Sequence, residues 1–132
     1  MKKLVIHTDG ASRGNPGRAA IGAILRDEKG ALGATISKSI GKTTNNQAEY
    51  RAVIAALEKA ASLGVENVEL NSDSELIVRQ IKGQYRVKKD TLRPLYENVM
   101  QLKSRFASFK IKHVPRERNK EADKLANAAL GR

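Results

Sequence analysis

The order of the periodic segments constrains this fold more than any other feature of the sequence. Apolar patterns typical of β-strands come first, at residues 2–8, 18–27 and 31–40, with residues 28–30 as a hairpin turn. A helix is predicted at 46–63, where apolar residues recur at 48, 52, 53, 56, 57 and 60 and a glycine follows at 64. Later patterns predict strands at 65–71 and 110–114, and helices at 74–82, 91–106 and 119–130.

Three leading strands followed by alternating helices and strands predict an α/β protein. A hairpin joins antiparallel strands, whereas strands joined through a helix run parallel. We therefore expect a mixed sheet, antiparallel at its start and parallel later, covered by helices. The chain has 132 residues, of which 40% are apolar, and shows no repeat or linker. Residues 1–132 are expected to form a single domain around one core.

Composition excludes several classes of protein. No apolar run approaches the roughly 18 residues of a membrane span. Only three strongly apolar residues lie between Lys3 and His7, too few for a signal peptide. Cysteine is absent, so disulfides and thiolate metal sites are excluded, and oxygen atoms or the two histidines must bind any metal. We expect a cytoplasmic protein without membrane contact.

The charge of the chain indicates a polyanionic partner. The net charge is +11 and the pI is about 10.1. The excess of positive charge is concentrated between residues 79 and 124, which contain 14 lysines and arginines but only five acids. Nucleic acid is the favoured partner, and a solvated basic surface is the alternative.

Two aspartates come where predicted strands end. Asp9 follows the apolar run of the first strand, and ligands in α/β sheets collect beyond such strand ends. Its alternative role is that of a turn-forming aspartate. Asp73 lies between the strand pattern VELNSD and the helix pattern SELIVRQ. Its alternative role is to stabilise a helix N-terminus by about 0.3–1 kcal/mol, with Ser72 and Glu75 available as a capping box.

Two further acids begin predicted helices. Glu49 lies on the apolar stripe of its helix, so it should point toward the sheet. The alternative is a capping box in which Asn46 is the N-cap and Glu49 the returning acid. Asp123 lies early in the last predicted helix, beside its apolar stripe, and an exposed first-turn acid is the alternative there.

The four acids would converge if the strands that precede them are neighbours. Each pair of like charges at about 4 Å would cost roughly 4 kcal/mol at an effective dielectric constant near 20. Protons or cations must then compensate. Oxygen ligands alone favour Mg²⁺ or Mn²⁺ over zinc, and two such ions about 3.5–4 Å apart can support phosphodiester cleavage.

These acids also lie in motifs that resemble those of type 1 ribonuclease H. The motifs are TDGASRGNPG, TTNNQAEYRAVIAAL, NSDSELIVRQIKG and VPRERNKEADKLA, in order over nearly the whole chain. The resemblance implies a ribonuclease H-like fold, with a five-stranded mixed sheet in strand order 3-2-1-4-5 and helices on both faces. It implies hydrolysis of the RNA strand of RNA–DNA hybrids, leaving 5′-phosphate and 3′-hydroxyl ends.

The same resemblance implies the functional residues. The catalytic metal ligands would be Asp9, Glu49, Asp73 and Asp123, holding two Mg²⁺ ions, with Mn²⁺ as an alternative. Contacts to the minor groove, where the 2′-hydroxyl distinguishes RNA from DNA, would come from Ser12, Gly14, Asn15, Asn45 and Asn46. Further contacts to the hybrid are expected from Arg86, Lys88 and Lys89.

The sequence departs from the family in three places. The loop PRERN lacks the histidine that many bacterial members carry, and Arg116 or Arg118 is expected to replace it. The Trp-rich basic insertion of other members is missing, and Glu75 stands where a glutamine is common. The remaining histidine near the acids, His7, is expected to have a structural role and not to be a metal ligand. The compact form resembles small archaeal members, some of which also cut double-stranded RNA.

Three functions therefore remain open at this point. The first is a monomeric, metal-dependent endonuclease acting on RNA–DNA hybrid duplexes. The second is the same fold acting on double-stranded RNA, and the third is a non-catalytic module that binds hybrids.

Overall fold

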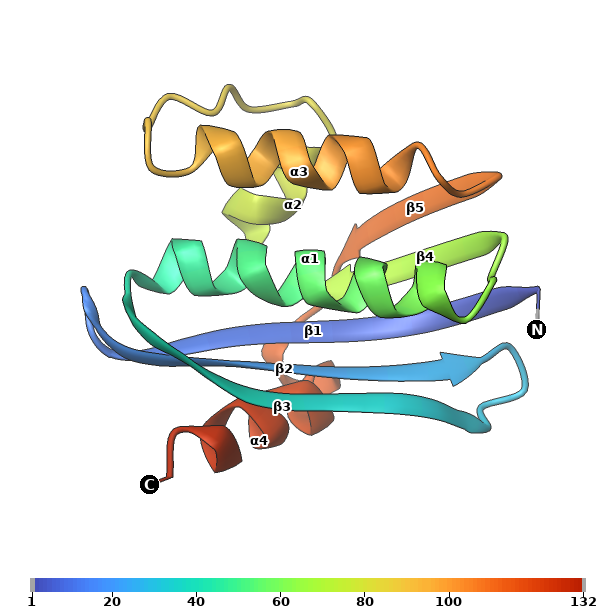
Figure 1. The fold of residues 1–132 in the computed structure, drawn as a ribbon, viewed down its shortest axis with the longest axis horizontal. Coiled ribbons are helices and arrows are strands. Elements are labelled where there is room, and N and C mark those ends of the chain that lie inside the picture. Colours follow the sequence, from blue (N-terminus) through green and yellow to red (C-terminus); the bar gives the residue numbers. More distant parts are fainter. Residues whose placement is uncertain (1, 132) are drawn as a thin grey trace.

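The computed structural model describes residues 2–131 and contains a five-stranded mixed sheet (Figure 1). Its strands are β1 (Lys3–Gly14), β2 (Gly17–Asp27), β3 (Leu32–Thr43), β4 (Asn67–Ser72) and β5 (Ser108–His113). They lie in the order β3-β2-β1-β4-β5. Strands β3, β2 and β1 are antiparallel, whereas β4 and β5 run parallel to β1. The predicted strand order and mixed character are confirmed.

Helices cover both faces of this sheet. They are α1 (Asn45–Ser62), α2 (Glu75–Ile81), α3 (Arg93–Lys103) and α4 (Lys120–Ala129), and a short 3₁₀ helix, Arg116–Arg118, precedes α4. Figure 1 shows α1, α2 and α3 on one side of the sheet and α4 on the other. Within residues 2–131, none of the helices combines the length and the apolar character that crossing a membrane requires.

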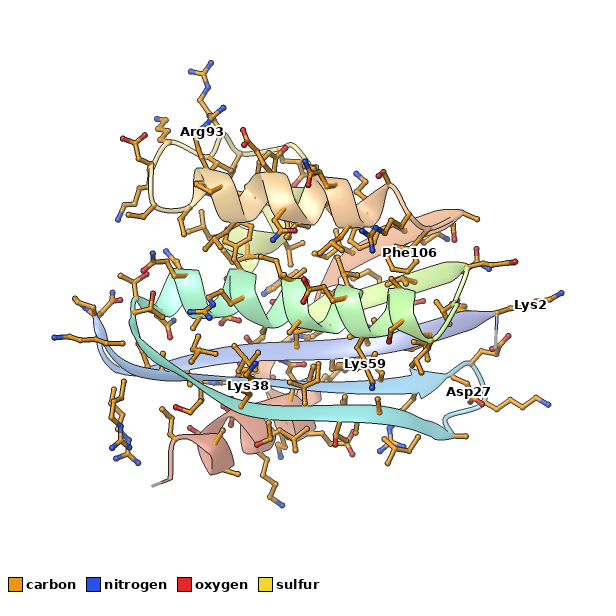
Figure 2. All side chains as sticks on the ribbon, viewed as in Figure 1. Lys2, Asp27, Lys38, Lys59, Arg93 and Phe106 are labelled. Carbon is orange, nitrogen blue, oxygen red and sulfur yellow. The ribbon has the colours of Figure 1, made fainter. Side chains whose placement is uncertain are left out.

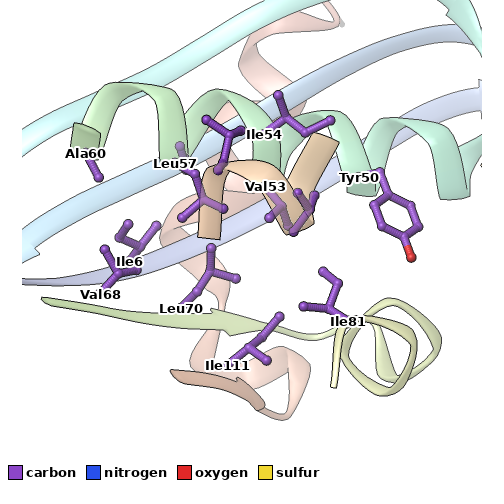
Figure 3. Close-up of a cluster of buried hydrophobic side chains, with 14 of the residues drawn as sticks. Ile6, Tyr50, Val53, Ile54, Leu57, Ala60, Val68, Leu70, Ile81 and Ile111 are labelled. Carbon is purple, nitrogen blue, oxygen red and sulfur yellow. The ribbon is translucent and has the colours of Figure 1, made fainter. Parts of the chain in front are cut away.

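The main core lies between the sheet and the side that carries α1. Ile6 of β1, Leu57 of α1 and Leu70 of β4 are fully buried in it (Figure 3). One buried polar contact joins α1 to α2, where the Tyr50 hydroxyl donates to Gln80 Oε1 at 2.7 Å. Charged side chains such as Arg93 extend outward (Figure 2). This core fixes the start of α1 against the sheet.

A glycine allows α4 to pack closely on the opposite face. A Cβ atom at Gly22 of β2 would lie 2.3 Å from the Ala122 carbonyl oxygen and 2.5 Å from the Ala126 amide nitrogen. These distances are far below van der Waals contact. Because Gly22 has no side chain, the backbone of α4 packs directly on β2. This packing brings Asp123 of α4 close to the sheet.

The predicted end of the first strand was wrong. β1 pairs with β4 only as far as Thr8, opposite Ser72, but it pairs with β2 up to Gly14. The hairpin turn is confined to Asn15 and Pro16. Asp9 is therefore inside a strand, at the point where β1 loses one of its two neighbours. The polar residues after it continue the strand because β2 still accompanies them.

The predicted helix caps also need correction. Thr44 is the N-cap of α1: its hydroxyl accepts from the Gln47 amide at 3.2 Å, and Gln47 Oε1 accepts from the Thr44 amide at 3.0 Å. A capping box of Asn46 and Glu49 is thereby excluded. Ser74, not Ser72, is the N-cap of α2. α3 is shorter than predicted, with a proline in its first turn.

Candidate active site

Three carboxylates meet where β1 and β4 separate. Asp9 and Asp73 each follow the last residue of the parallel ladder between these strands, the pair Thr8 and Ser72. Glu49 reaches the same point from the first turn of α1. One oxygen atom from each of the three acids lies within 4.8 Å of the others. Asp9 and Glu49 are 40 positions apart in the chain, and Glu49 and Asp73 are 24 positions apart, yet the three acids share one site.

Glu49 is held in place by the glycine that follows Asp9. The Gly10 amide donates to Glu49 Oε1 at 3.0 Å in a buried hydrogen bond. A Cβ atom at Gly10 would lie 2.4 Å from both the Ala48 carbonyl carbon and the Glu49 amide nitrogen. Only glycine lets α1 approach β1 this closely. Glu49 is 6% exposed, so it faces the sheet as its place on the apolar stripe predicted.

Asp123 joins the group from the opposite face of the sheet. It lines the same cleft as Asp9 and contributes to the raised pKa of the Asp9 carboxyl. Asn127, one turn later on α4, donates through Nδ2 to Asp123 Oδ1 at 3.2 Å. Asp123 is outside the three-acid cluster defined by the 4.8 Å separation. The structure therefore gathers three of the four predicted acids tightly and places the fourth beside them.

The clustering strongly perturbs two of the acids. Burial, the Asp73 charge and the neighbouring Asp123 together raise the pKa of Asp9 from 3.8 to about 8, and Arg116 opposes the shift. Burial and the charges of Asp9 and Asp73 likewise raise the pKa of Glu49 well above its ordinary value. Burial and mutual repulsion therefore disfavour ionisation of all these carboxylates together, and cations would relieve that repulsion.

The donor set fits hard divalent cations. All the candidate ligand atoms are carboxylate oxygens, which Mg²⁺ and Mn²⁺ prefer, and the cluster has the excess negative charge that such ions neutralise. The cleft around it has a volume of about 590 Å³ and is open to solvent on one side. It therefore has room for a polymer backbone next to the acids.

The chain is similar in sequence and in structure to known proteins. A family model described as reverse transcriptase-like matches residues 7–129. Ribonuclease HI of Halobacterium salinarum is 47% identical over 92% of this chain and 61% of its own length. The crystal structure of RNase H1 from that archaeon has a TM-score of 0.95 at 44% identity, covering 98% of both chains. The chain belongs to the ribonuclease H family.

Two other members of the ribonuclease H family are comparably similar. The LC11-RNase H1, isolated from compost, was crystallised in complex with an RNA/DNA hybrid, and that structure has a TM-score of 0.92 at 44% identity. The aligned region covers 97% of this chain and 96% of the LC11-RNase H1 chain. The bifunctional protein Rv2228c of Mycobacterium tuberculosis is 44% identical over 97% of this chain. The chain spans 61% of the length of the Halobacterium relative and 35% of that of Rv2228c.

Of the nucleic-acid contacts predicted in the β1–β2 hairpin and at the start of α1, some lie beside the acids and others do not. Ser12 and Asn45 line the cleft. Asn15, in the β1–β2 hairpin, accepts through Oδ1 from the Asn45 amide at 2.9 Å, which ties the hairpin to the start of α1. Gly14, with φ of +93°, makes the turn before Asn15 possible. Asn46, the next residue of α1, does not line the cleft.

The two arginines of the loop before α4 lie in different places. Arg116 lines the cleft, whereas Arg118 lines a separate hollow together with His7. Burial lowers the pKa of His7, although Glu121 and Glu69 oppose the shift. His7 is thus outside the acidic cleft, as expected of a structural histidine. Of the two arginines, only Arg116 lines the cleft.

The predicted basic contacts form a separate exposed segment. Arg86, Lys88 and Lys89 lie in the loop between α2 and α3 and do not line the cleft. The loop is anchored by buried Val87, whose carbonyl oxygen accepts from Arg93 Nη1 at 3.2 Å. Figure 1 shows this loop at the same end of the molecule as the start of α1 and the β1–β2 hairpin.

Sequence reasoning missed two asparagines near the acids. Asn127 supports Asp123, and its four-residue spacing on a predicted helix could have indicated this contact. Asn119 is 1% exposed, and its Nδ2 donates to the Thr8 carbonyl oxygen at 2.8 Å. It joins the end of the β1–β4 ladder to the start of α4. A polar residue before a helix normally suggests only an N-cap. The sequence around Asn119 therefore gave no sign of its bond to the Thr8 carbonyl oxygen.

Proposed function

We propose that this chain is a metal-dependent endonuclease that hydrolyses the RNA strand of RNA–DNA hybrids and leaves 5′-phosphate and 3′-hydroxyl ends. The observation that carries this proposal is the convergence of Asp9, Glu49 and Asp73, with Asp123 beside them, in an open cleft of a basic protein. The relative crystallised with an RNA/DNA hybrid supports the choice of substrate. Residues 1–132 are proposed to act as one domain.

The four carboxylates are the proposed ligands of two Mg²⁺ ions, with Mn²⁺ as an alternative. When bound, such ions lower the pKa of a coordinated water and offset negative charge on the phosphate. Without them, the raised pKa means that the Asp9 carboxyl retains a proton at pH 7. Occupation of the site should therefore release a proton from this carboxyl. Glu49, whose Oε1 accepts from the Gly10 amide, is also proposed to help orient a 2′-hydroxyl.

The remaining groups of the cleft are proposed to position the duplex. Backbone and side-chain groups of Ser12, Asn15 and Asn45 offer both donors and acceptors for a ribose edge. Gly14, Asn46 and Arg118 would contact the flanking sugars and phosphates. The guanidinium of Arg116 is a fixed positive charge at the rim of the acidic cleft, suited to a phosphate oxygen. Arg86, Lys88 and Lys89 would hold the hybrid backbone at a distance from the reacting phosphate.

Cleavage of end-labelled duplexes tests this function. RNA–DNA hybrid, duplex RNA and duplex DNA are each incubated with Mg²⁺, Mn²⁺ or EDTA. We expect the RNA strand of the hybrid to be cut with either metal and not in EDTA, with 5′-phosphate ends that a ligase accepts. Cleavage of duplex RNA would widen the substrate class, and hybrid binding without cleavage in either metal would identify a non-catalytic module.

A matched pair of variants tests the site. Asp73→Asn keeps the shape of the side chain but removes a proposed ligand charge, so cleavage should be lost while the fold and hybrid binding persist. Glu58→Gln, an exposed position on α1, makes the equivalent change away from the cleft and should leave cleavage unchanged. Near-normal turnover by Asp73→Asn would reject the assigned site.

A further inference from the structure

A basic groove follows the outer edge of β5 and shares no residue with the acidic cleft. Its volume is about 390 Å³. It is formed by the ends of α2 and α3 together with β5, and its lining residues are Ile81, Lys82, Lys103, Phe109, Lys110, Ile111 and Lys112. Four of these seven residues are lysines and none is acidic, so the groove is strongly positive.

The groove lies along the edge of the sheet and not on one of its faces. Successive residues of a strand point to opposite faces. Phe109 and Ile111 pack toward the core, whereas Lys110 and Lys112 are exposed, and both sets line the groove. Among residues 2–131, β5 pairs only with β4. Within these residues, no strand pairs with the N–H and C=O groups on the other edge of β5.

The floor of this groove is apolar. Ile81 and Ile111 are core residues that approach each other in Figure 3, and both line the groove. Phe109 is half-buried, and Lys103 Nζ lies 5.8 Å from the centre of its ring. A strand that paired with β5 would place every second side chain against this floor.

The charge of the rim is largely uncompensated. Among the described residues, the only salt bridge of the four lysines joins Lys112 to Glu69 at 3.4 Å, and Glu69 is shared with Lys3 at 3.5 Å. Lysines on an open edge oppose pairing with a second copy, because two such edges repel each other. They do not oppose an acidic strand. The charge thus opposes pairing between two β5 edges and favours a negatively charged partner.

We propose that the β5 edge binds an acidic, extended peptide segment of another protein, which adds to the sheet as a sixth strand. Its backbone pairs with β5, its apolar side chains contact the floor, and its carboxylates face Lys82, Lys103 and Lys110. Nucleic acid would use mainly the lysines, because it has no strand edge to pair with β5 and the groove offers a single aromatic ring for base stacking. This interaction is independent of the proposed nuclease activity.

Binding of defined probes to the full chain tests the proposal. The first probe is a fluorescein-labelled decapeptide of alternating glutamate and valine. The second is the same peptide with N-methyl groups on every second residue, which keeps the charges but blocks strand pairing. The third is a ten-nucleotide single strand of thymidylate. Fluorescence anisotropy gives the affinities, and amide chemical shifts from ¹⁵N spectra locate the site.

We expect saturable binding of the first peptide, with shifts confined to β5 and the adjacent ends of α2 and α3. Lys110→Glu and Lys103→Glu should each weaken it by about fivefold. Lys38→Glu, on the opposite edge strand β3, should not. Thermal melting of each variant verifies folding, and two independent positions guard against a single misfolded one.

Three results would overturn the proposal. One is absence of saturable peptide binding, or binding that both charge reversals leave unchanged. Another is equal binding of the N-methylated peptide, which would exclude strand pairing. The third is equal or tighter binding of the oligonucleotide at β5, which would assign the groove to nucleic acid instead.

Discussion

Replacing Asp9 by asparagine should stabilise the protein when divalent cations are removed. The pKa of Asp9 is raised from 3.8 to about 8 by burial and by its acidic neighbours. The unfolded chain therefore binds fewer protons than the folded chain between these two pH values. Stability falls as pH rises through this window, because ionising the folded carboxyl is unfavourable. Asparagine has no charge to bury, so the variant escapes this loss.

The size of the effect follows from the same shift. At about 1.4 kcal/mol per pH unit, the interval from 3.8 to pH 7 sets a ceiling of about 4 kcal/mol. Local rearrangement and entry of water reduce the penalty, so we expect a gain of about 1–3 kcal/mol at pH 7, or about 3–10 °C in Tm. The gain should be near zero at pH 4 and should reach its maximum above pH 8.

Thermal denaturation in EDTA across this pH range measures the gain. Glu58→Gln, an exposed acid on α1, is the matched control. Adding Mg²⁺ should raise the Tm of the wild type more than that of Asp9→Asn, because the variant has lost a proposed ligand. A gain that is equal at pH 4 and pH 8, or destabilisation at pH 8, would refute the idea that repulsion and burial strain this site.

Three further outcomes are expected. Gly10→Ala should cost about 1–3 kcal/mol in urea denaturation and impair cleavage, because its Cβ would lie 2.4 Å from the backbone of Ala48; full stability would contradict that close approach. Thr44→Ala should cost about 1 kcal/mol by removing the cap of α1, and Asn46→Ala much less; equal losses would argue against the assigned box. Replacing Lys88 and Lys89 by alanine should weaken hybrid binding and lower its log–log salt slope by about 0.7–0.9 per lost phosphate contact. An unchanged slope would show that these lysines do not touch the backbone.

Periodicity was sufficient to predict the elements of this protein and the mixed character of its sheet, whereas the strand order 3-2-1-4-5 came from the resemblance to type 1 ribonuclease H. Every predicted strand and helix is present, because apolar spacing reports which face of an element is buried. The position of Glu49 on an apolar stripe also correctly indicated that this acid faces the sheet. Asp9 and Asp73 were expected to lie near each other if their strands are neighbours, and the β1–β4 ladder places them at equivalent positions.

The sequence failed where a residue's role depends on a neighbour distant in the chain. β1 continues beyond Asp9 because β2 still pairs with it, and no local pattern records that change of partner. Asn119 turns inward to the Thr8 carbonyl, where a cap would have turned toward the helix. Arg116 and Arg118 are separated by the path of a single 3₁₀ turn, which is too short to show a period.

A crystal of the wild-type protein grown with Mn²⁺ offers the most direct measurement, because anomalous scattering locates this metal unambiguously. We predict Mn²⁺ bonded to carboxylate oxygens of Asp9, Glu49 and Asp73 where β1 and β4 separate, with Asp123 completing a second position once substrate is present. Anomalous peaks only elsewhere on the protein, or none at saturating Mn²⁺, would contradict the claim that these acids form a shared cation site.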